Sequence, residues 1–478
     1  YTGAAFVRSR DATAYTIGVA ISGTVSSDPV AVPSDGSWVL VTGSALVGAG
    51  AKTVNVLSED GAADIDVWGV HTYISTLGGM ADVPADERAV STYTTYLPTT
   101  GSARFLARRE NHRYNGSSVV IAGQLQEQAS TNLLSADDST AIAGWSTFGS
   151  NETATSDAVT RLGFDDWDEI ADNNAGGSGV VGKISGGVTL AAGNHCAWVV
   201  VERSKTNGDL YLEFANFTLS GAVAYFNAST GAVLSTSGTG YVDSGSVELA
   251  SGLFLCYLVC NIDAGDVVGS LKVLVTNGTD VTPALDGTHG LYASMAQIEA
   301  GGFPTSFIHA NGAAVTRATD VTTGQVLAAD TFFSTTGASF SFKGRINYAD
   351  TGAIQEVQPF RSQVDSNNNV EFYLNASSTR EGRVTTIMDA LAVTRSEELS
   401  TPQYTPGVDV AVNMAARWSA ASINVAKDGT ASSETTAVTM ADLTSADLDL
   451  FMIGNGNVEM MLGFSADIGD TGLTEVTT

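Results

Sequence analysis

The sequence has few basic residues. It contains 22 Lys+Arg against 51 Asp+Glu in 478 residues, which gives a formal net charge of −29. Nucleic-acid binding needs a basic surface that neutralises phosphates, so this charge argues against a nucleic-acid partner and also disfavours anionic membranes. The simplest interpretation of the acidity is solubility, because net charge governs colloidal behaviour rather than fold.

Cysteine, proline and long apolar runs are also scarce. The chain has 9 prolines and three cysteines, Cys196, Cys256 and Cys260. On an extended strand Cys256 and Cys260 share a face but lie about 13 Å apart, beyond disulfide reach. The sequence therefore predicts no disulfide framework. No run of about 20 apolar residues exists, so it predicts no membrane insertion.

Alternation of apolar and polar residues is abundant, and this is the pattern of half-buried strands. Turn clusters such as "DSNNN", "TNGTD" and "KDGT" separate the alternating segments. The sequence therefore predicts an all-β fold of tandem antiparallel β-sandwich (jelly-roll) domains. Helical periodicity is weak, with two short helices expected at 78–94 and 440–448. The inward-facing sets are Ile17, Val19 and Ile21; Leu210, Leu212 and Phe214; Phe340 and Phe342; and Val370, Phe372 and Leu374.

Three landmarks recur in the same order in two regions, which indicates that one sandwich is used twice. "DGSWVLVTG" corresponds to "SGLFLCYLV", which aligns Trp38 with Phe254. "IDVWGVHTY" corresponds to "YASMAQIEAG", which aligns Trp68 with Met295. We also expect Trp38 and Trp198 to belong to the cores. The first copy lacks the lead-in that begins at Gln124, so we expect it to be a partial sandwich without the first strands.

A length of 478 residues predicts about three domains at roughly 150 residues each. The predicted boundaries place a partial jelly-roll β-sandwich, a truncated copy, at 1–110 and a complete jelly roll at 111–320. After residue 320 the strand series changes, and a third sandwich is predicted at 321–478. Trp418 in this region precedes a strand that enters an Asp-Gly turn, a strong hairpin signal.

Three stretches carry a family resemblance: "GQLQEQASTNLLS" with the following "GW", "AQIEAGGFPTSFI", and "GAAVTRATD". They resemble modules of tailed-bacteriophage virion proteins, notably tail fibres, head fibres and minor structural proteins. The middle region is similar to carbohydrate-binding-module jelly rolls, and the C-terminal region to the concanavalin A/laminin-G-like sandwich. The resemblance covers 124–478 and extends to 1–109 as a degenerate copy, in which "VHT" replaces "QIE" and "LARRE" replaces "VTRATD".

The resemblance implies a non-enzymatic phage virion structural protein, a fibre, spike or decoration on the tail or head. Its expected location is the virion. Its expected partners are other phage virion proteins, further copies of itself in a homo-oligomer, and a host surface glycan. Two alternatives remain open: a secreted bacterial glycan-binding module of a polysaccharide-degrading enzyme, and a bacterial surface adhesin.

The stretch "GGFPTSFIHANGAAVTRATD", residues 301–320, joins the second and third regions without being a Gly/Ser linker. We expect it to be a terminal strand that runs straight into the next sandwich, with the domains in a row. Pro304 suits an edge or corner, where a missing backbone donor is tolerated. Arg317 and Asp320 are expected to fix the junction as a charge pair.

Catalytic motifs are absent from the sequence. The five histidines form no HExxH pair, and no G-x-S-x-G elbow or P-loop is present. The segment "FDDWDEIAD" crowds Asp165, Asp166 and Asp168, whose carboxylates could hold Ca²⁺ through hard oxygen ligands. The competing interpretation is a solvated acidic loop beside a buried Trp167. No other cofactor is expected.

Glycan binding would need exposed aromatic residues on a sheet face with polar neighbours. Tyr211 points away from the face of Leu210, Leu212 and Phe214, and Glu213 lies beside it on the same side of the strand. Tyr211, Glu213 and Tyr225 are therefore the candidate ligand-binding residues, and packing is the competing role for each aromatic ring.

Overall fold

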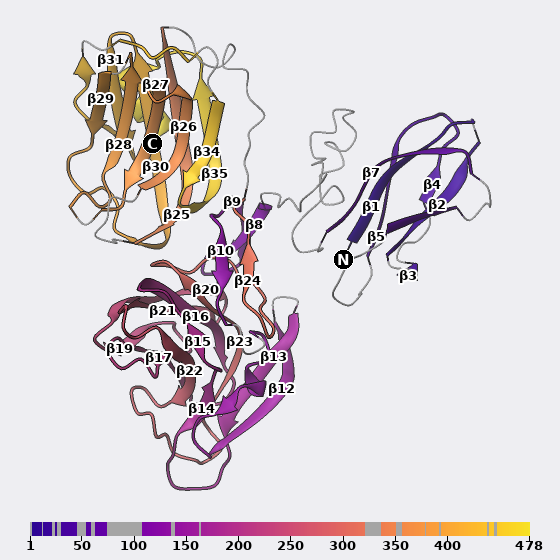
Figure 1. The fold of residues 1–478 in the computed structure, drawn as a ribbon, viewed down its shortest axis with the longest axis vertical. Coiled ribbons are helices and arrows are strands. Elements are labelled where there is room, and N and C mark those ends of the chain that lie inside the picture. Colours follow the sequence, from indigo (N-terminus) through magenta and orange to yellow (C-terminus); the bar gives the residue numbers. More distant parts are fainter. Residues whose placement is uncertain are drawn as a thin grey trace. The chain divides into compact units, whose positions relative to one another are not determined.

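The structure is a computed structural model of the whole chain, and it divides into two compact units, Tyr1–Arg109 and Glu110–Thr478. Figure 1 draws the ribbon. Among the helices of the described part of the chain, none combines the length and apolarity needed to cross a membrane. The described residues are 2–11, 13–21, 24–25, 30–44, 54–58, 63–73, 108–134, 139–161, 164–320, 336–349, 356–377, 379–391, 393–436, 439–443 and 447–478.

The N-terminal unit contains two antiparallel sheets, as the alternation of its sequence predicts. One sheet has the order β5-β1-β7; in the other, β2 pairs with β3, β4 and β6. Its core includes Ala5, Val7, Ile17, Val19 and Val41. The strands are β1 Thr2–Ser9, β2 Tyr15–Ile21, β3 Thr24–Val25, β4 Val30–Val32, β5 Val39–Ser44, β6 Val54–Ser58 and β7 Ile65–Tyr73.

The jelly roll of the second unit has two sheets, β11-β14-β22-β17-β18-β19 with β15 beside β22, and β12-β13-β23-β16-β21-β20. Their facing sides bury Leu210, Leu212 and Phe214, as the alternation predicts. Cys196, Cys256 and Cys260 are buried and free. The strands are β10 Ser130–Asn132, β11 Ser146–Thr147, β12 Glu152–Arg161, β13 Phe164–Asp172, β14 Val181–Ile184, β15 Val188–Thr189, β16 Gly193–Arg203, β17 Asp209–Ala215, β18 Ala222–Phe226, β19 Val233–Ser237, β20 Tyr241–Ala250, β21 Leu253–Ile262, β22 Val268–Thr276, β23 Gly290–Ala300 and β24 Val315–Arg317, with a 3-10 turn, η3, at Ile142–Gly144.

The C-terminal sandwich packs the sheet β32-β31-β30-β25-β35-β9-β8, with β33 beside β31, against β29-β28-β27-β26-β34. Phe342, Phe372 and Trp418 are fully buried between them. The elements are β8 Arg108–Tyr114, β9 Val119–Gln126, β25 Gly337–Tyr348, β26 Glu356–Asp365, β27 Asn368–Asn375, β28 Val384–Ala390, β29 Val393–Glu398, β30 Gly407–Ser419, β31 Ser422–Lys427, β32 Thr430–Ala431, β33 Thr435–Thr436, β34 Asp447–Ile453, β35 Asn455–Phe464 and α3 Gly469–Val476.

The α-helix seen among the described residues is not at either of the two positions that the sequence predicts. Residues 78–94 lie outside the described residues, and the described part of 440–448 is irregular before β34 begins. The helix α3 follows the last strand instead. It is held by Arg417, whose side chain is 4% exposed and lies 2.7 Å from Asp470 and 3.0 Å from Asp467.

One sheet of the N-terminal unit has the same strand order as part of a jelly-roll sheet. In the sheet β5-β1-β7, strand β1 lies between β5 and β7, just as β16 lies between β21 and β23 in the jelly roll. The ladder bulge between Ala4 and Phe6 corresponds to the bulge between Trp198 and Val200. At this bulge Met295 of β23 has φ 56, in the left-handed region, as bulged positions often do.

The register of the repeat corrects the sequence alignment by one residue. Val7 pairs with Val39 in the first copy, and Val201 with Phe254 in the second. If the bulges are matched, Phe254 corresponds to Val39 instead of Trp38. Trp68 pairs with Phe6 in the first copy, and Ser294 pairs with Val200 in the second. Trp68 therefore corresponds to Ser294 instead of Met295. A shift of one residue moves each side chain to the opposite face of a strand.

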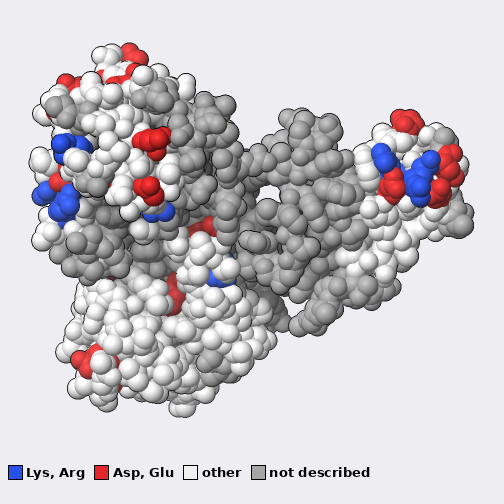
Figure 2. All heavy atoms as spheres, turned by 45° about the horizontal axis from the view of Figure 1, so that its top comes forward, with Lys and Arg blue, Asp and Glu red and all other residues white. Residues whose placement is uncertain are grey.

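Trp38 accordingly lies outside the core. It is half-buried just before β5, and the guanidinium carbon of Arg8 lies 4.8 Å from the centroid of its ring. Trp198 is 1% exposed, as expected for a core residue. In Figure 2 the charged side chains visible on the described surface lie in small groups, several of which mix both signs.

The hairpin β8–β9 connects the jelly roll to the C-terminal sandwich in an unexpected way. The predicted boundaries place these residues in the middle domain, whereas β9 pairs with β35, with Gln126 opposite Gly456 and Gln124 opposite Val458. Figure 1 shows β9 close to β35. The jelly roll is therefore inserted between β9 and β25 of the C-terminal sandwich, instead of simply preceding it.

Residues 301–320 are held by buried carboxylates rather than by a strand. Phe307 packs edge-on against Trp198, with ring centroids 6.0 Å apart, over the outer side of the sheet that contains β16. Glu299 accepts hydrogen bonds from the Trp198 indole at 2.9 Å and from the Thr305 backbone N–H at 2.8 Å. Only the short β24 is extended, and it pairs with β10.

Arg317 and Asp320 both contact Glu127, which corrects the expected pair. Arg317 Nη1 lies 2.8 Å from Glu127 Oε2, in a pair whose side chains are 10% and 3% exposed. Asp320 Oδ2 accepts the backbone N–H of Glu127 at 3.0 Å. The two residues that the sequence pairs with each other thus fix the segment before β10 from both sides.

Candidate functional site

The three candidate ligand-binding residues come together on the outer side of a jelly-roll sheet. Tyr211 and Glu213 are alternate residues of β17, so they share one side of the strand. Tyr211 lies opposite Tyr225 of β18, and Glu213 lies opposite Lys272 of β22. Phe148, which follows β11, completes the group. We call Phe148, Tyr211, Glu213, Tyr225 and Lys272 the tyrosine face.

Aromatic contacts order the tyrosine face at both ends. The rings of Tyr211 and Tyr225 meet edge-to-face with centroids 5.0 Å apart and an interplanar angle of 76°. The Lys272 ammonium lies 4.0 Å from the centroid of the Phe148 ring, a cation–π distance. All five side chains are partly exposed, so the face is accessible to solvent.

Glu213 is the polar centre of the tyrosine face. Its Oε2 accepts the Tyr211 hydroxyl at 2.7 Å and lies 2.6 Å from Lys272 Nζ. The side chains of Lys272 and Glu213 are only 12% and 20% exposed, so the pair is less screened by water than a surface pair. Its donors and acceptors are therefore fixed in direction before any ligand arrives.

Both tyrosines remain neutral at ordinary pH. Burial, the hydrogen bond to Glu213 and its charge raise the pKa of Tyr211, and burial followed by the Glu213 charge raises the pKa of Tyr225. Each hydroxyl therefore keeps its proton. Aromatic surface beside oriented polar groups suits a ligand with an apolar ring face and hydroxyl edges.

Phe148 and Lys272 were missed from the sequence because Lys272 lies on another strand, β22, and Phe148 lies just after β11. A lysine inside the apolar run "SLKVLVT" signals a position that faces water. That signal does not show which strand lies beside β22, because its neighbour β17 is separated from it in the sequence by four other strands.

The acidic candidates lie on a strand, not in a solvated loop. "FDDWDEIAD" forms β13, which pairs with β12 and β23. Trp167 is fully buried, as expected, and Asp168 is 1% exposed and accepts the Ala143 backbone N–H at 2.6 Å. The side chains of Asp165 and Asp166 lie outside the described residues. Asp168 thus serves to fix η3.

A different acidic group forms at the end of β13. Ligand atoms of Asp172, Asp286 and His289 lie within 4.8 Å of one another. Asp172 already accepts backbone N–H groups from Asn174, Gly287 and His289 at 2.9, 2.7 and 2.9 Å. These three donors hold the loop after β13 and the loop before β23 to the Asp172 carboxylate. The i, i+3 spacing in "DGTHG" was the available sequence signal.

Comparisons with known proteins identify no family for this chain. No family model and no curated protein matches the sequence. Among solved structures, the chain is similar to the receptor binding domain of botulinum neurotoxin mosaic serotype C/D, with 12% identity and a TM-score of 0.25; the match covers 30% of this chain and 36% of that one. It is also similar to the LG1-3 region of the laminin alpha2 chain, with 8% identity and a TM-score of 0.17, covering 98% and 93%.

Scores this low carry no argument about function. The strand pairing itself defines the class: an all-β protein built from antiparallel β-sandwiches, with an aromatic and polar group on one outer sheet face of the jelly roll.

Proposed function

We propose that the protein is a non-enzymatic binding module that attaches to a glycan through the tyrosine face of its jelly roll. The observation that carries the proposal is the convergence of Tyr211, Tyr225 and the Glu213–Lys272 pair on a solvent-accessible sheet face. A sugar ring offers C–H groups that pack on aromatic surface and hydroxyl groups that both donate and accept hydrogen bonds. Glu213 and Lys272 supply the complementary acceptor and donor.

Removal of the aromatic surface is expected to weaken binding of a recognised glycan. A single site of this size should bind at about millimolar to high-micromolar strength. Tyr225→Ala should weaken it about tenfold, because an aromatic contact contributes on the order of 1 kcal/mol or more. Tyr225→Phe, which keeps the ring, should bind nearly as the parent does. Isothermal titration of the full chain, guided by a glycan array, measures these affinities.

Leu391→Ala is the matched control, since Leu391 is 74% exposed at the turn between β28 and β29 of the other sandwich. It should leave binding unchanged. A folded Tyr211→Ala/Tyr225→Ala double variant that binds the glycan as tightly as the parent would exclude the tyrosine face.

We further propose that this module is carried on a tailed-phage virion as part of a fibre, spike or decoration, assembled with other virion proteins and with copies of itself. The resemblance of residues 124–478 to such modules supports this, as does the acidic charge, which suits display in solution rather than contact with DNA. Weak sites displayed in several copies can gain about 10²–10⁴ in avidity.

Deletion of the gene is expected to leave DNA packaging intact and to slow adsorption to the host. Adsorption rates and the DNA content of purified particles test this. Capsids that fail to assemble without the protein would instead indicate a role in the shell.

A further inference from the structure

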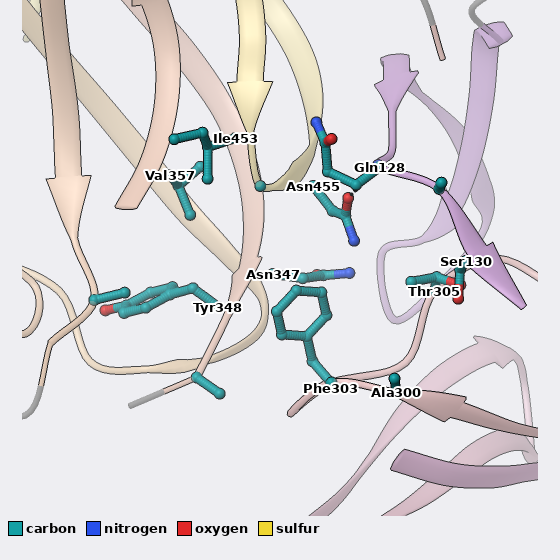
Figure 3. Close-up of a pocket in the computed structure, with 15 residues that line it drawn as sticks. Gln128, Ser130, Ala300, Phe303, Thr305, Asn347, Tyr348, Val357, Ile453 and Asn455 are labelled. Atoms are coloured by element: carbon teal, nitrogen blue, oxygen red, sulfur yellow. Dashed lines mark hydrogen bonds between the residues drawn. The ribbon is translucent and has the colours of Figure 1, made fainter. Parts of the chain in front are cut away.

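A cavity of about 240 Å³ lies between the jelly roll and the C-terminal sandwich within the second unit. The jelly-roll side contributes the end of β23 and the turn after it, together with the segment that leads into β10. The other sandwich contributes the ends of β25 and β34 and the start of β35. Figure 3 shows the cavity, and its lining residues are Gln128, Ala129, Ser130, Ala300, Gly301, Phe303, Thr305, Asn347, Tyr348, Ala349, Val357, Ala376, Ile453, Gly454 and Asn455.

None of these 15 lining residues is charged, although the chain carries a formal net charge of −29. The hydroxyls of Ser130 and Thr305 at the edge of the cavity donate to the buried carboxylate of Glu299, at 2.5 and 2.6 Å. Glu299 therefore places a negative group behind this wall, which opposes an anionic ligand. Among the described residues, no acidic side chain of the lining offers a cation a direct partner. The cavity thus favours a neutral ligand.

Two asparagine side chains direct donors into the cavity. Asn455, 4% exposed, accepts the Gln128 backbone N–H through Oδ1 at 2.6 Å. Asn347 accepts the Asp409 backbone N–H through Oδ1 at 2.8 Å. Because these bonds fix which end of each amide is oxygen, both nitrogens face the other way. Figure 3 shows both nitrogens directed into the space beside the ring of Phe303.

These donors are largely unused by the protein. Asn347 Nδ2 has one long contact, 3.3 Å to the Pro304 carbonyl oxygen. Among the described residues, Asn455 Nδ2 has no hydrogen-bond partner, although its residue is almost completely buried. An amide nitrogen carries two N–H groups, so both side chains have donors left for a ligand in the cavity. The two amide nitrogens therefore favour a ligand with several oxygen acceptors.

Apolar surface completes the site opposite the amides. Phe303 is partly exposed beside the amide nitrogens, and Val357 and Tyr348 form another wall. A volume of about 240 Å³ is below the usual range of roughly 300–1,000 Å³ for drug-sized ligands. Size, neutrality, aromatic surface and oriented N–H donors together fit one hydroxylated six-membered ring.

We propose that this cavity binds one residue of a neutral sugar and that binding holds the two sandwiches together. The site shares no residue with the tyrosine face, so it does not depend on that face being a binding site. Since both sandwiches line it, a bound sugar should reduce the exchange of backbone amides on both sides.

The experiment is hydrogen exchange of the full chain with glucose, galactose, N-acetylglucosamine or galacturonic acid, combined with ligand-observed NMR. At least one neutral sugar, at tens of millimolar, should slow exchange about twofold or more at 128–130, 301–305, 347–349 and 453–455, as expected for weak single-ring binding. Galacturonic acid should have a smaller effect. Absence of protection by every neutral sugar, or stronger protection by galacturonic acid, overturns the proposal.

Two variants localise the effect. Asn455→Asp keeps the acceptor for the Gln128 N–H but replaces the free amide nitrogen with a carboxylate oxygen. Ala129→Trp adds a large side chain at an exposed lining position, where folding should be little affected. Both should abolish the protection, with circular dichroism confirming the fold. The Tyr211→Ala/Tyr225→Ala variant should retain it. Protection that survives in both cavity variants, or that disappears in the tyrosine-face variant, contradicts this site.

Discussion

Replacement of Arg317 by alanine is expected to destabilise the jelly roll by about 3–5 kcal/mol, the range measured when one partner of a buried ion pair is removed. The Glu127 side chain, 3% exposed, would lose the guanidinium that lies 2.8 Å away. Arg317 Nη2 also donates to the Gln128 carbonyl at 3.0 Å, so a backbone contact would be lost as well. Hydrogen exchange of β16 and β21 amides in urea measures the change.

Lys205→Ala provides the comparison within the same sandwich. Lys205 lies 3.3 Å from Glu169 with its side chain 39% exposed, so its removal should cost below about 1 kcal/mol. Glu127→Gln in the Arg317→Ala background should recover part of the loss, because the remaining group would be neutral. Equal effects of the Arg317 and Lys205 variants would show that the buried pair has no special role.

Gly123→Ala is expected to separate β9 from β35. Gly123 has φ +97, and a Cβ on it would lie 2.0 Å from the Val458 carbonyl oxygen, well inside van der Waals contact with backbone. The variant should lose at least about 3 kcal/mol, with the conformational strain and the clash adding together. Faster amide exchange across β9 and the start of β35 is the measurement.

Gly116 in the same hairpin isolates the conformational part of this effect. Its φ is +91, and a Cβ on it would have no other atom within 4 Å. Gly116→Ala should therefore cost only about 1–2 kcal/mol, from the left-handed backbone alone. If both alanine variants lose the same stability, the contact between Gly123 and Val458 does not limit the pairing.

The fold class was predictable because period-two alternation depends only on local sequence. Leu210, Leu212 and Phe214 are buried as predicted, and the "KDGT" turn places Asp428 and Gly429 at φ 41 and 74, the left-handed pair that an Asp-Gly hairpin needs. The register of the repeat was not predictable in the same way. Matching Trp38 to Phe254 by aromatic character overrode the alternation, which places Val39 at the core position.

The tyrosine face was partly predictable for the same reason. Tyr211 and Glu213 follow from alternation along β17, whereas Phe148 and Lys272 depend on which strands become neighbours. The cavity was not predictable at all, since Asn347 and Asn455 meet Gln128 only through the pairing of β9, β25 and β35. Long-range strand pairing of this kind leaves no short sequence pattern.

The pairing of β9 with β35 determines how the second unit would carry tension. Gln126 lies opposite Gly456, so a pull between Glu110 and Thr478 passes from one strand to the other through their backbone hydrogen bonds. The jelly roll lies between these two strands in the sequence and outside this path. While β9 stays paired with β35, the jelly roll bears no load and keeps its folded geometry. By this topology, the jelly roll would be stretched only after β9 has separated from β35.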